Sequence, residues 1–138
     1  FQKIHEDAII PKFAKEGDAG LDITAIESCL LNPGQHFLVK TGLKMEIPYG
    51  YEAQVRPRSG LALKNKITVL NSPGTIDSGY RGEIGVIMMN HSSEIFQVNK
   101  GERIAQLVIA KHETPEIHEV EELEESKRGE GGFGSTGL

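Results

Sequence analysis

The residues best suited to chemistry lie in the stretch 71–90, NSPGTIDSGYRGEIGVIMMN, where Asp77 and Tyr80 stand three residues apart. Around them are glycine, serine, proline and asparagine, the residues that form tight turns. Backbone N–H and C=O groups in such a turn are not used by a sheet ladder, so they can bind a small polar ligand. The apolar run 84–89 that follows has the length of a buried strand. We therefore expect a tight hairpin at the end of a buried strand, with an ordinary surface turn as the alternative.

The C-terminal segment 128–138 is the second candidate for chemistry. It combines Arg128 and Phe133 with a Gly-Ser-Thr cluster, and it has no core-forming pattern. The Arg offers a charged fork to phosphate, clustered N–H and hydroxyl groups suit phosphate oxygens, and an aromatic face can stack on a planar base. We expect a mobile tail that binds such groups, and a flexible terminus without this role is the alternative.

Four further polar residues could contact anions or a metal. In the segment 56–64, RPRSGLALK, Ser59 precedes good helix formers, so it predicts either a phosphate-binding helix start or a plain N-cap. Arg103 and Gln106 lie three apart in an alternating strand, which predicts opposite faces and lets only one of them reach a shared site. Asp22 lies in a strand pattern and would alone be an ordinary exposed carboxylate.

Composition limits the class of protein. A chain of 138 residues has room for one domain, and its 16 glycines and six prolines indicate many turns and short strands. The net charge of −5 argues against a nucleic-acid-binding surface spread over the whole protein. Cys29 is the lone cysteine, so an intrachain disulfide is excluded and a small buried apolar role is expected. No apolar run suits a membrane span or a signal segment, so we expect a cytoplasmic location.

The five histidines are scattered and predict surface positions. No cluster of Cys or His has the spacing of metal ligands. Any metal is therefore expected to be an oxygen-bound Mg²⁺ that arrives with phosphates.

Short strands must position these groups. The runs 43–47 and 51–55 alternate apolar and polar residues around the loop 48–50, a pattern that predicts a β-hairpin. Strands separated by short turns, with at most one short helix, predict an all-β barrel or sandwich. Further strands are expected at 19–25, 67–70, 84–89, 95–98 and 104–110.

The segment 113–127, ETPEIHEVEELEESK, is ambiguous. Ile117, Val120 and Leu123 lie three apart, which suits one stripe of a helix. Pro115 and the shortness of the segment weaken that interpretation, and its many glutamates suit a solvated face.

Five motifs occur in a fixed order along the chain, and together they are far more specific than any one alone. In all five, the chain resembles the homotrimeric dUTPase family, the dUTP diphosphatases, over essentially its whole length. The third and fifth motifs are the most specific. The motifs are AGLDITA at 19–25, RPRSGLALK at 56–64, NSPGTIDSGYRGEIGV at 71–86, GERIAQLVI at 101–109 and RGEGGFGSTG at 128–137.

The resemblance implies a jelly-roll-like β-barrel subunit that assembles as a homotrimer. It implies a barrel domain over 1–127 and a tail over 128–138 that closes over an active site. The implied reaction is hydrolysis of dUTP to dUMP and diphosphate, by attack of water at the α-phosphate with Mg²⁺ as cofactor. This reaction limits uracil incorporation into DNA and supplies dUMP for thymidylate synthesis.

The resemblance also implies roles for single residues. Asp77 matches the catalytic carboxylate that activates water, Tyr80 matches the residue that leaves no room for a 2′-hydroxyl, and Asp22 matches the carboxylate that places the metal through water. The implied uracil and deoxyribose contacts are Asn71, Gly74, Ile76, Tyr80 and Phe133. The implied phosphate contacts are Arg58, Ser59, Gly60, Gln106, Arg128, Gly134, Ser135 and Thr136.

In the family, three subunits build each site and a neighbour donates the tail. One departure is visible, since many members carry an acidic residue at the position of Gly79. Two alternatives are a dCTP deaminase, which shares this fold, and a nucleotide-binding regulator without turnover. Tyr80 and the RSGLA motif argue against the first, and the intact Asp77 and complete tail argue against the second. No nucleic-acid or membrane partner is expected.

Overall fold

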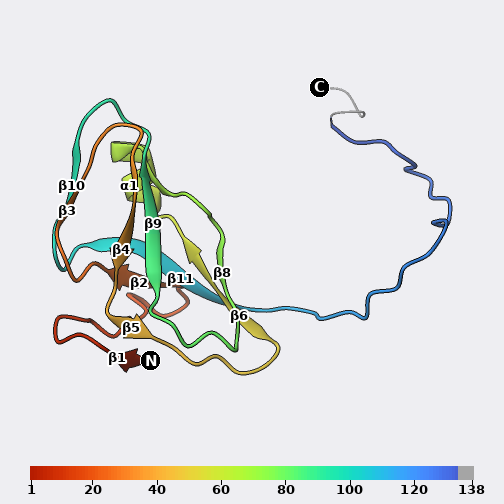
Figure 1. Cartoon of the computed structure of the whole chain (residues 1–138), viewed down its shortest axis with the longest axis horizontal. Helices are drawn as coiled ribbons and strands as arrows, with labels where there is room; N and C mark the ends of the chain where they lie inside the picture. Colours follow the sequence, from red (N-terminus) through yellow and green to blue (C-terminus); the bar gives the residue numbers. More distant parts are fainter. Residues whose placement is uncertain (134–138) are drawn as a thin grey trace.

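The computed structural model describes residues 1–133 as a small β-barrel with one short helix and a long C-terminal extension (Figure 1). Every strand pairing described is antiparallel, as expected for strands joined by short turns. The elements run in the order β1 (Gln2–Lys3), β2 (Gly20–Thr24), β3 (Cys29–Leu31), β4 (His36–Lys40), β5 (Leu43–Lys44), β6 (Tyr51–Arg56), α1 (Ser59–Asn65), β7 (Ile67–Val69), β8 (Gly74–Ile76), β9 (Gly85–Asn90), β10 (Phe96–Val98) and β11 (Arg103–Lys111).

Two sheets form most of the barrel. One has the strand order β2-β11-β6-β8 and the other has the order β4-β9-β7, and β1-β5 and β10-β3 form two further two-stranded sheets. Strands distant in sequence are therefore neighbours in space. The predicted mostly-β architecture with one short helix is confirmed.

The core consists of aliphatic side chains from alternate strand positions. In β6, Ala53 and Val55 are buried, which confirms the predicted two-residue period. In β9, Val86 and Met88 are buried while the residues that alternate with them on the other face are only partly covered, so the apolar run 84–89 is a strand with one face in the core. Each large side chain buried in this way contributes roughly 1.5–3 kcal/mol. Among the described residues, the buried hydrophobic side chains are Ala, Leu, Ile, Val and Met, without an aromatic ring. Cys29, expected to be buried, is only partly covered and packs against the edge of this core.

The two runs around the loop 48–50 do not form the predicted hairpin. Residues 43–44 pair with β1, whereas β6 pairs with β11 and β8 in another sheet. A turn is still closed by the Tyr51 N–H, which donates to the Pro48 carbonyl at 3.2 Å. Alternation thus predicts which face of a strand is buried, but it does not identify the neighbouring strand.

The stretch 71–90 also differs from the expected hairpin. Its strand β8 pairs with β6 in the four-stranded sheet, and β9 pairs with β4 and β7 in the other sheet. The segment 77–84 therefore crosses from one sheet to the other. Its backbone groups remain outside any ladder, so the reasoning about ligand binding still applies.

Helix α1 begins one residue earlier than a Ser59 cap would require. Arg58 occupies the N-cap position and makes no side-chain capping bond, so the prediction that Ser59 caps the helix is wrong. The helix ends at Asn65, and the C-cap residue Lys66 adopts φ of 56° and donates its N–H to the carbonyls of Ala62 and Leu61. Ser59 and Gly60 consequently lie exposed in the first turn.

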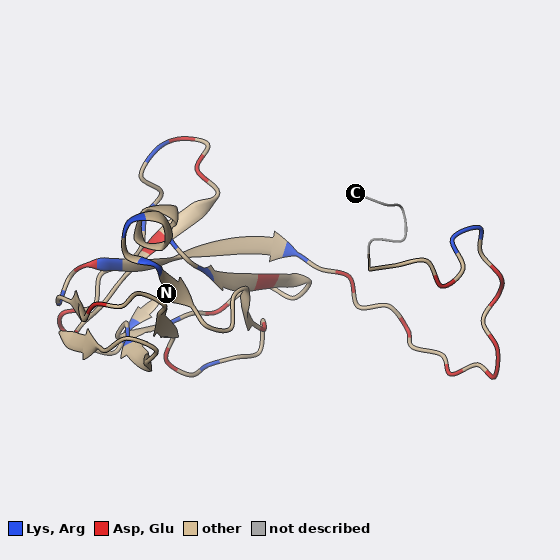
Figure 2. Cartoon of the chain, turned by 90° about the horizontal axis from the view of Figure 1, so that it is seen from above, with Lys and Arg blue, Asp and Glu red and all other residues tan. Residues whose placement is uncertain are grey.

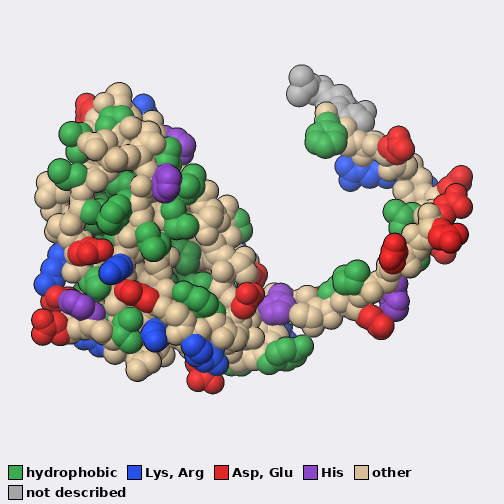
Figure 3. Space-filling model, viewed as in Figure 1, with side chains coloured by type: hydrophobic (Ala, Val, Ile, Leu, Met, Phe, Trp, Pro, Cys, Tyr) green, Lys and Arg blue, Asp and Glu red, His purple; other side chains and the backbone are tan. Residues whose placement is uncertain are grey.

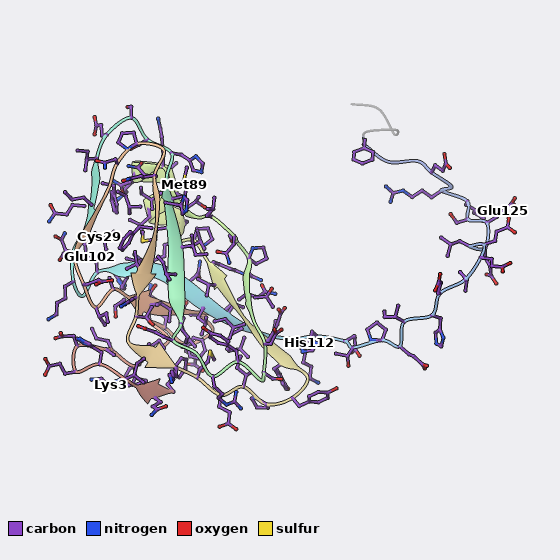
Figure 4. The ribbon with its side chains drawn as sticks, viewed as in Figure 1. Lys3, Cys29, Met89, Glu102, His112 and Glu125 are labelled. Atoms are coloured by element: carbon purple, nitrogen blue, oxygen red, sulfur yellow. The ribbon has the colours of Figure 1, made fainter. Side chains whose placement is uncertain are left out.

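The chain leaves the barrel after β11, near His112, and runs outward without regular secondary structure to residue 133 (Figures 1 and 4). The helix considered for 113–127 does not form. Its would-be stripe is open to solvent, with Ile117 86% and Leu123 84% exposed. Because no helix packs these side chains, the segment has no internal core (Figure 3). In residues 1–133, no helix has the length and apolarity needed to cross a membrane.

Candidate active site

A cavity of about 250 Å³ opens where the segment 77–84 crosses between the two sheets. It brings together all five residues of the third motif that the sequence selected, namely Asn71, Gly74, Ile76, Asp77 and Tyr80. The other lining residues are Leu38, Val55, Thr75, Glu83, Ile84, Gly85 and Ile87. We call this cavity the Asp77 pocket.

The local fold of the Asp77 pocket follows from two tight contacts. The Tyr80 N–H donates to the Asp77 carbonyl at 3.0 Å and closes a turn, which places the carboxylate and the phenol on one loop. The Asn71 amide lies over Gly74, where an added β-carbon would come within 3.1 Å of its nitrogen. Glycine at 74 therefore lets the Asn71 side chain and the strand backbone approach one another closely.

The crossing segment is fastened to the barrel at its far end. The buried Thr41 hydroxyl donates to the Ile84 carbonyl at 2.6 Å, and the Ile84 N–H donates to the Leu43 carbonyl at 2.8 Å. Thr41 and Leu43 have no exposed surface and Ile84 is 1% exposed, so water does not compete for these bonds. The pocket loop is thus held between the two sheets.

A second group of predicted residues meets on the four-stranded sheet. The Asp22 carboxylate accepts hydrogen bonds from Arg58 Nε and from Arg103 Nη1, each at 3.0 Å. Arg58 Nη1 also donates to the Arg103 carbonyl at 3.2 Å, while Gln106 Nε2 donates to the Pro57 carbonyl at 2.9 Å. We call Asp22, Arg58, Arg103 and Gln106 the arginine cluster.

Arg103 and Gln106 lie on the same face of β11, contrary to the prediction. The register of β11 against β2 shifts between Arg103 and Ala105, and the adjacent Ile104 and Ala105 are both buried. A β-bulge of this kind inserts one extra residue and resets the alternation beyond it. Both polar side chains therefore reach the neighbourhood of Asp22.

Strand register separates the Asp77 pocket from the arginine cluster. Asp22 pairs with Gln106, which pairs with Arg56, whereas Ile76, just before Asp77, pairs with Ala53. The two sites therefore differ by four residues along β6 and by three strand spacings across the sheet. At about 3.4 Å per residue and about 4.8 Å per strand, their backbones lie roughly 20 Å apart.

The two described tail residues selected from the sequence, Arg128 and Phe133, contact neither site within the chain. Arg128 Nε donates to the Gly131 carbonyl at 2.8 Å, and Phe133 is exposed. Figure 2 shows the extension leading away from the barrel, with several acidic stretches and one basic stretch along it. Gly134, Ser135 and Thr136 lie outside the described residues.

The side chains near Asp22 could hold a metal ion only if the substrate supplied most of its ligands. Within residues 1–133, no three His, Cys, Asp or Glu side chains converge as metal ligands. Asp22 is a single carboxylate whose two oxygens already accept hydrogen bonds from guanidinium groups. Such a carboxylate suits contact with a metal through water, and phosphate oxygens would have to supply the inner ligands.

Comparison with known proteins identifies the chain. The family model described as dUTPase matches residues 6–137. The chain belongs to the dUTPase family. Deoxyuridine 5′-triphosphate nucleotidohydrolases of Clostridium tetani and Gloeothece citriformis are 57% and 55% identical to this dUTPase-family chain. These matches cover 97% and 99% of this chain and 92% and 94% of the relatives.

Solved structures agree with this assignment. The dUTPase of Staphylococcus bacteriophage 80alpha, solved with dUPNHPP, has a TM-score of 0.92 and 33% identity, covering 99% of this chain and 96% of the phage chain. A point mutant of the dUTPase from phage phi11 of S. aureus, which coordinates a structural Mg(II) ion, has a TM-score of 0.83 and 29% identity. That match covers 90% of this chain and 97% of the phage chain. The family predicted from five motifs is confirmed, and so is the dUTPase fold class.

Some residues of this dUTPase-family site were not predicted from the sequence. Leu38 and Ile87 line the Asp77 pocket from β4 and β9, and nothing in their strand patterns distinguishes them from other apolar residues. Glu83 lies within the third motif, and this position is the sequence feature that could have identified it as a pocket residue. Arg103 was a candidate from the sequence, but its position beside Asp22 depends on a bulge that alternation alone cannot predict.

Proposed function

We propose that this protein hydrolyses dUTP to dUMP and diphosphate. The observation that carries the proposal is the Asp77 pocket, in which a carboxylate, a phenol and an amide converge on a cavity of about 250 Å³. The identity to nucleotidohydrolases that act on deoxyuridine 5′-triphosphate, over nearly the full chain, supports the same substrate. A phage relative was solved with the dUTP analogue dUPNHPP, which supports a ligand of this kind.

The base is proposed to bind beside Asn71 and the β8 backbone at Gly74 and Ile76. Uracil presents an O4 acceptor where cytosine presents an N4 donor. A rigid strand with a fixed donor discriminates strongly between them, because the wrong base leaves buried polar groups unpaired. Tyr80 is proposed to lie against the deoxyribose, with Phe133 of a tail stacked on the base.

The phosphates are proposed to bind the arginine cluster of another subunit. A single chain holds Asp77 and Asp22 roughly 20 Å apart at the backbone, as strand spacing and rise dictate. An activated water must lie within hydrogen-bond reach of its base and also of the phosphorus that it attacks. If the phosphates bind the arginine cluster, the Asp77 of the same chain is too far away to reach the water that attacks them. This separation supports a homotrimer whose sites are shared between subunits. Residues 1–127 as a barrel domain and 128–138 as a donated tail remain part of this proposal.

Asp77 is proposed to accept the proton of the attacking water. Arg58 and Gln106 would bind phosphate oxygens, with the exposed N–H groups at Ser59 and Gly60, and with Arg128, Gly134, Ser135 and Thr136 of the tail. A bound Mg²⁺ would neutralise phosphate charge, with Asp22 orienting one of its waters. Since the net charge of the protein is −5, local cations and N–H groups must supply the attraction for a triphosphate.

A product assay tests the proposal directly. The protein is incubated with dUTP and Mg²⁺, and separately with dCTP, and the products are separated. We expect dUMP and diphosphate from dUTP and no reaction with dCTP. Deamination of dCTP would support the related deaminase instead, and binding without product would support a regulator. A cytoplasmic location remains a prediction from the sequence.

A further inference from the structure

The two residues Gly82 and Glu83 determine where the Tyr80 ring lies. The Tyr80 hydroxyl donates to the Glu83 carbonyl at 3.0 Å. The ring lies so close to Gly82 that a β-carbon at this position would overlap the phenol. Tyr80 is 46% exposed, so burial alone does not fix the ring. Its position in the pocket therefore depends on the backbone of the next few residues.

The backbone of Glu83 is in turn held by its own carboxylate. Glu83 Oε1 accepts a hydrogen bond from the Gly42 N–H at 2.9 Å, in a partly buried position. Gly42 has φ of +66°, and a β-carbon there would lie 2.8 Å from His5 Cβ and 2.9 Å from Ala8 Cβ. This donor is consequently fixed, because only glycine fits its conformation and its packing. Glu83 thus connects Tyr80 to a rigid corner of the barrel.

We propose that Glu83 is a positioning residue for sugar discrimination, with Gly82 leaving the space that the Tyr80 ring occupies. This inference rests on the proposed function, in which the ring excludes a 2′-hydroxyl. The Glu83 carboxylate fixes the carbonyl that holds the phenol, and the phenol then forms a stable wall beside the sugar. Without that support, the ring can move away and a ribose can enter.

Sugar preference in the full-length protein tests this inference. The kcat/KM values for dUTP and UTP are measured for the parent and for Glu83→Ala, Gly82→Ala and Glu83→Gln. An added hydroxyl is rejected by shape alone by about 10²-fold, so the dUTP to UTP ratio should fall about tenfold or more in both alanine variants. Glu83→Gln retains an oxygen acceptor for the Gly42 N–H and should keep the parental ratio.

Val98→Ala is the matched control. Val98 has no exposed surface and lies in β10, outside the pocket, so its truncation lowers stability without touching Tyr80. General destabilisation reduces both kcat/KM values together and leaves their ratio unchanged. A parental ratio in Glu83→Ala or in Gly82→Ala would overturn the inference, as would a Gln variant that behaves like the Ala variant. Should Glu83→Ala not fold, Gly82→Ala and Glu83→Gln decide the question. A parent that hydrolyses neither nucleotide refutes the proposed function and this inference with it.

Discussion

Mixed trimers made from two inactive variants would test whether each site needs two subunits. Asp77→Asn removes the proposed base from the Asp77 pocket and should reduce turnover about 10²–10⁴-fold. Arg58→Ala removes a cation from the arginine cluster, and losing one such preorganised group costs about 10²–10³-fold. Each homotrimer alone should therefore have at most about 1% of parental activity.

The expected recovery follows from the separation of the two half-sites in one chain. In an equimolar mixture, half of the pockets carry an intact Asp77, and half of these face an intact Arg58 from another subunit. About one quarter of all sites are then complete, if subunits assemble at random into closed symmetric trimers. The mixture should thus regain about one quarter of the parental activity, more than tenfold above either variant alone.

The assay measures diphosphate release from dUTP after the two variants are unfolded together and refolded. Each variant refolded alone, and the two mixed without unfolding, are the controls. If Asp77 and Arg58 acted within one chain, no mixed trimer would contain a complete site. An absence of recovery at every mixing ratio would then refute the register argument and the shared site.

Three other predictions concern Tyr80, the tail and Cys29. Tyr80→Ala should narrow the preference for dUTP over UTP because the ring no longer occupies the space of a 2′-hydroxyl; equal kcat/KM values for both nucleotides in the parent would contradict this. Truncation after Lys127 should leave a folded trimer by gel filtration with severely reduced turnover, because Arg128 and Phe133 are lost; parental turnover in the truncated protein would exclude a role for the tail. Burial, assisted by the nearby Glu27 charge, raises the pKa of the Cys29 thiol above its ordinary value of 9.0, so the free energy of unfolding should fall as pH rises above that value. Urea unfolding at pH values of about 8 and about 10 would measure this fall, and Cys29→Ala should reduce it.

Much of the fold could be predicted from local patterns. Alternation in β6 identified the buried residues correctly because side chains on a strand point to opposite faces in turn, and the apolar run 84–89 correctly indicated a strand at β9. The same patterns failed for strand partners. Residues 43–47 and 51–55 are close in sequence and alternate well, yet they enter different sheets, since pairing depends on long-range packing that no local window contains.

Several residues of the candidate site could be predicted from the sequence, whereas the long-range contacts that orient them could not. The third motif predicted Asp77, Tyr80, Asn71 and Gly74, and the structure brings all four to one cavity. Arg103 was placed incorrectly because its orientation depends on a bulge. A bulge changes the face of the sheet to which every residue beyond it points. The hydrogen bond from the Gly42 N–H to Glu83 spans 41 residues, so it leaves no local signal in the sequence.

The aliphatic core has a consequence for optical measurements. The chain contains no Trp and three Tyr, and none of these rings is among the fully buried side chains. Tyr49 is 84% exposed, whereas Tyr80 lines the Asp77 pocket. Tyr51 is only partly buried, but its ring packs against the core. Tyrosine emission and near-ultraviolet circular dichroism therefore report on the Asp77 pocket and on the edge of the core, and not on its interior. Of the three tyrosines, Tyr80 is the one that lines the Asp77 pocket, so a change in its signal on nucleotide binding would report on the pocket without any introduced label.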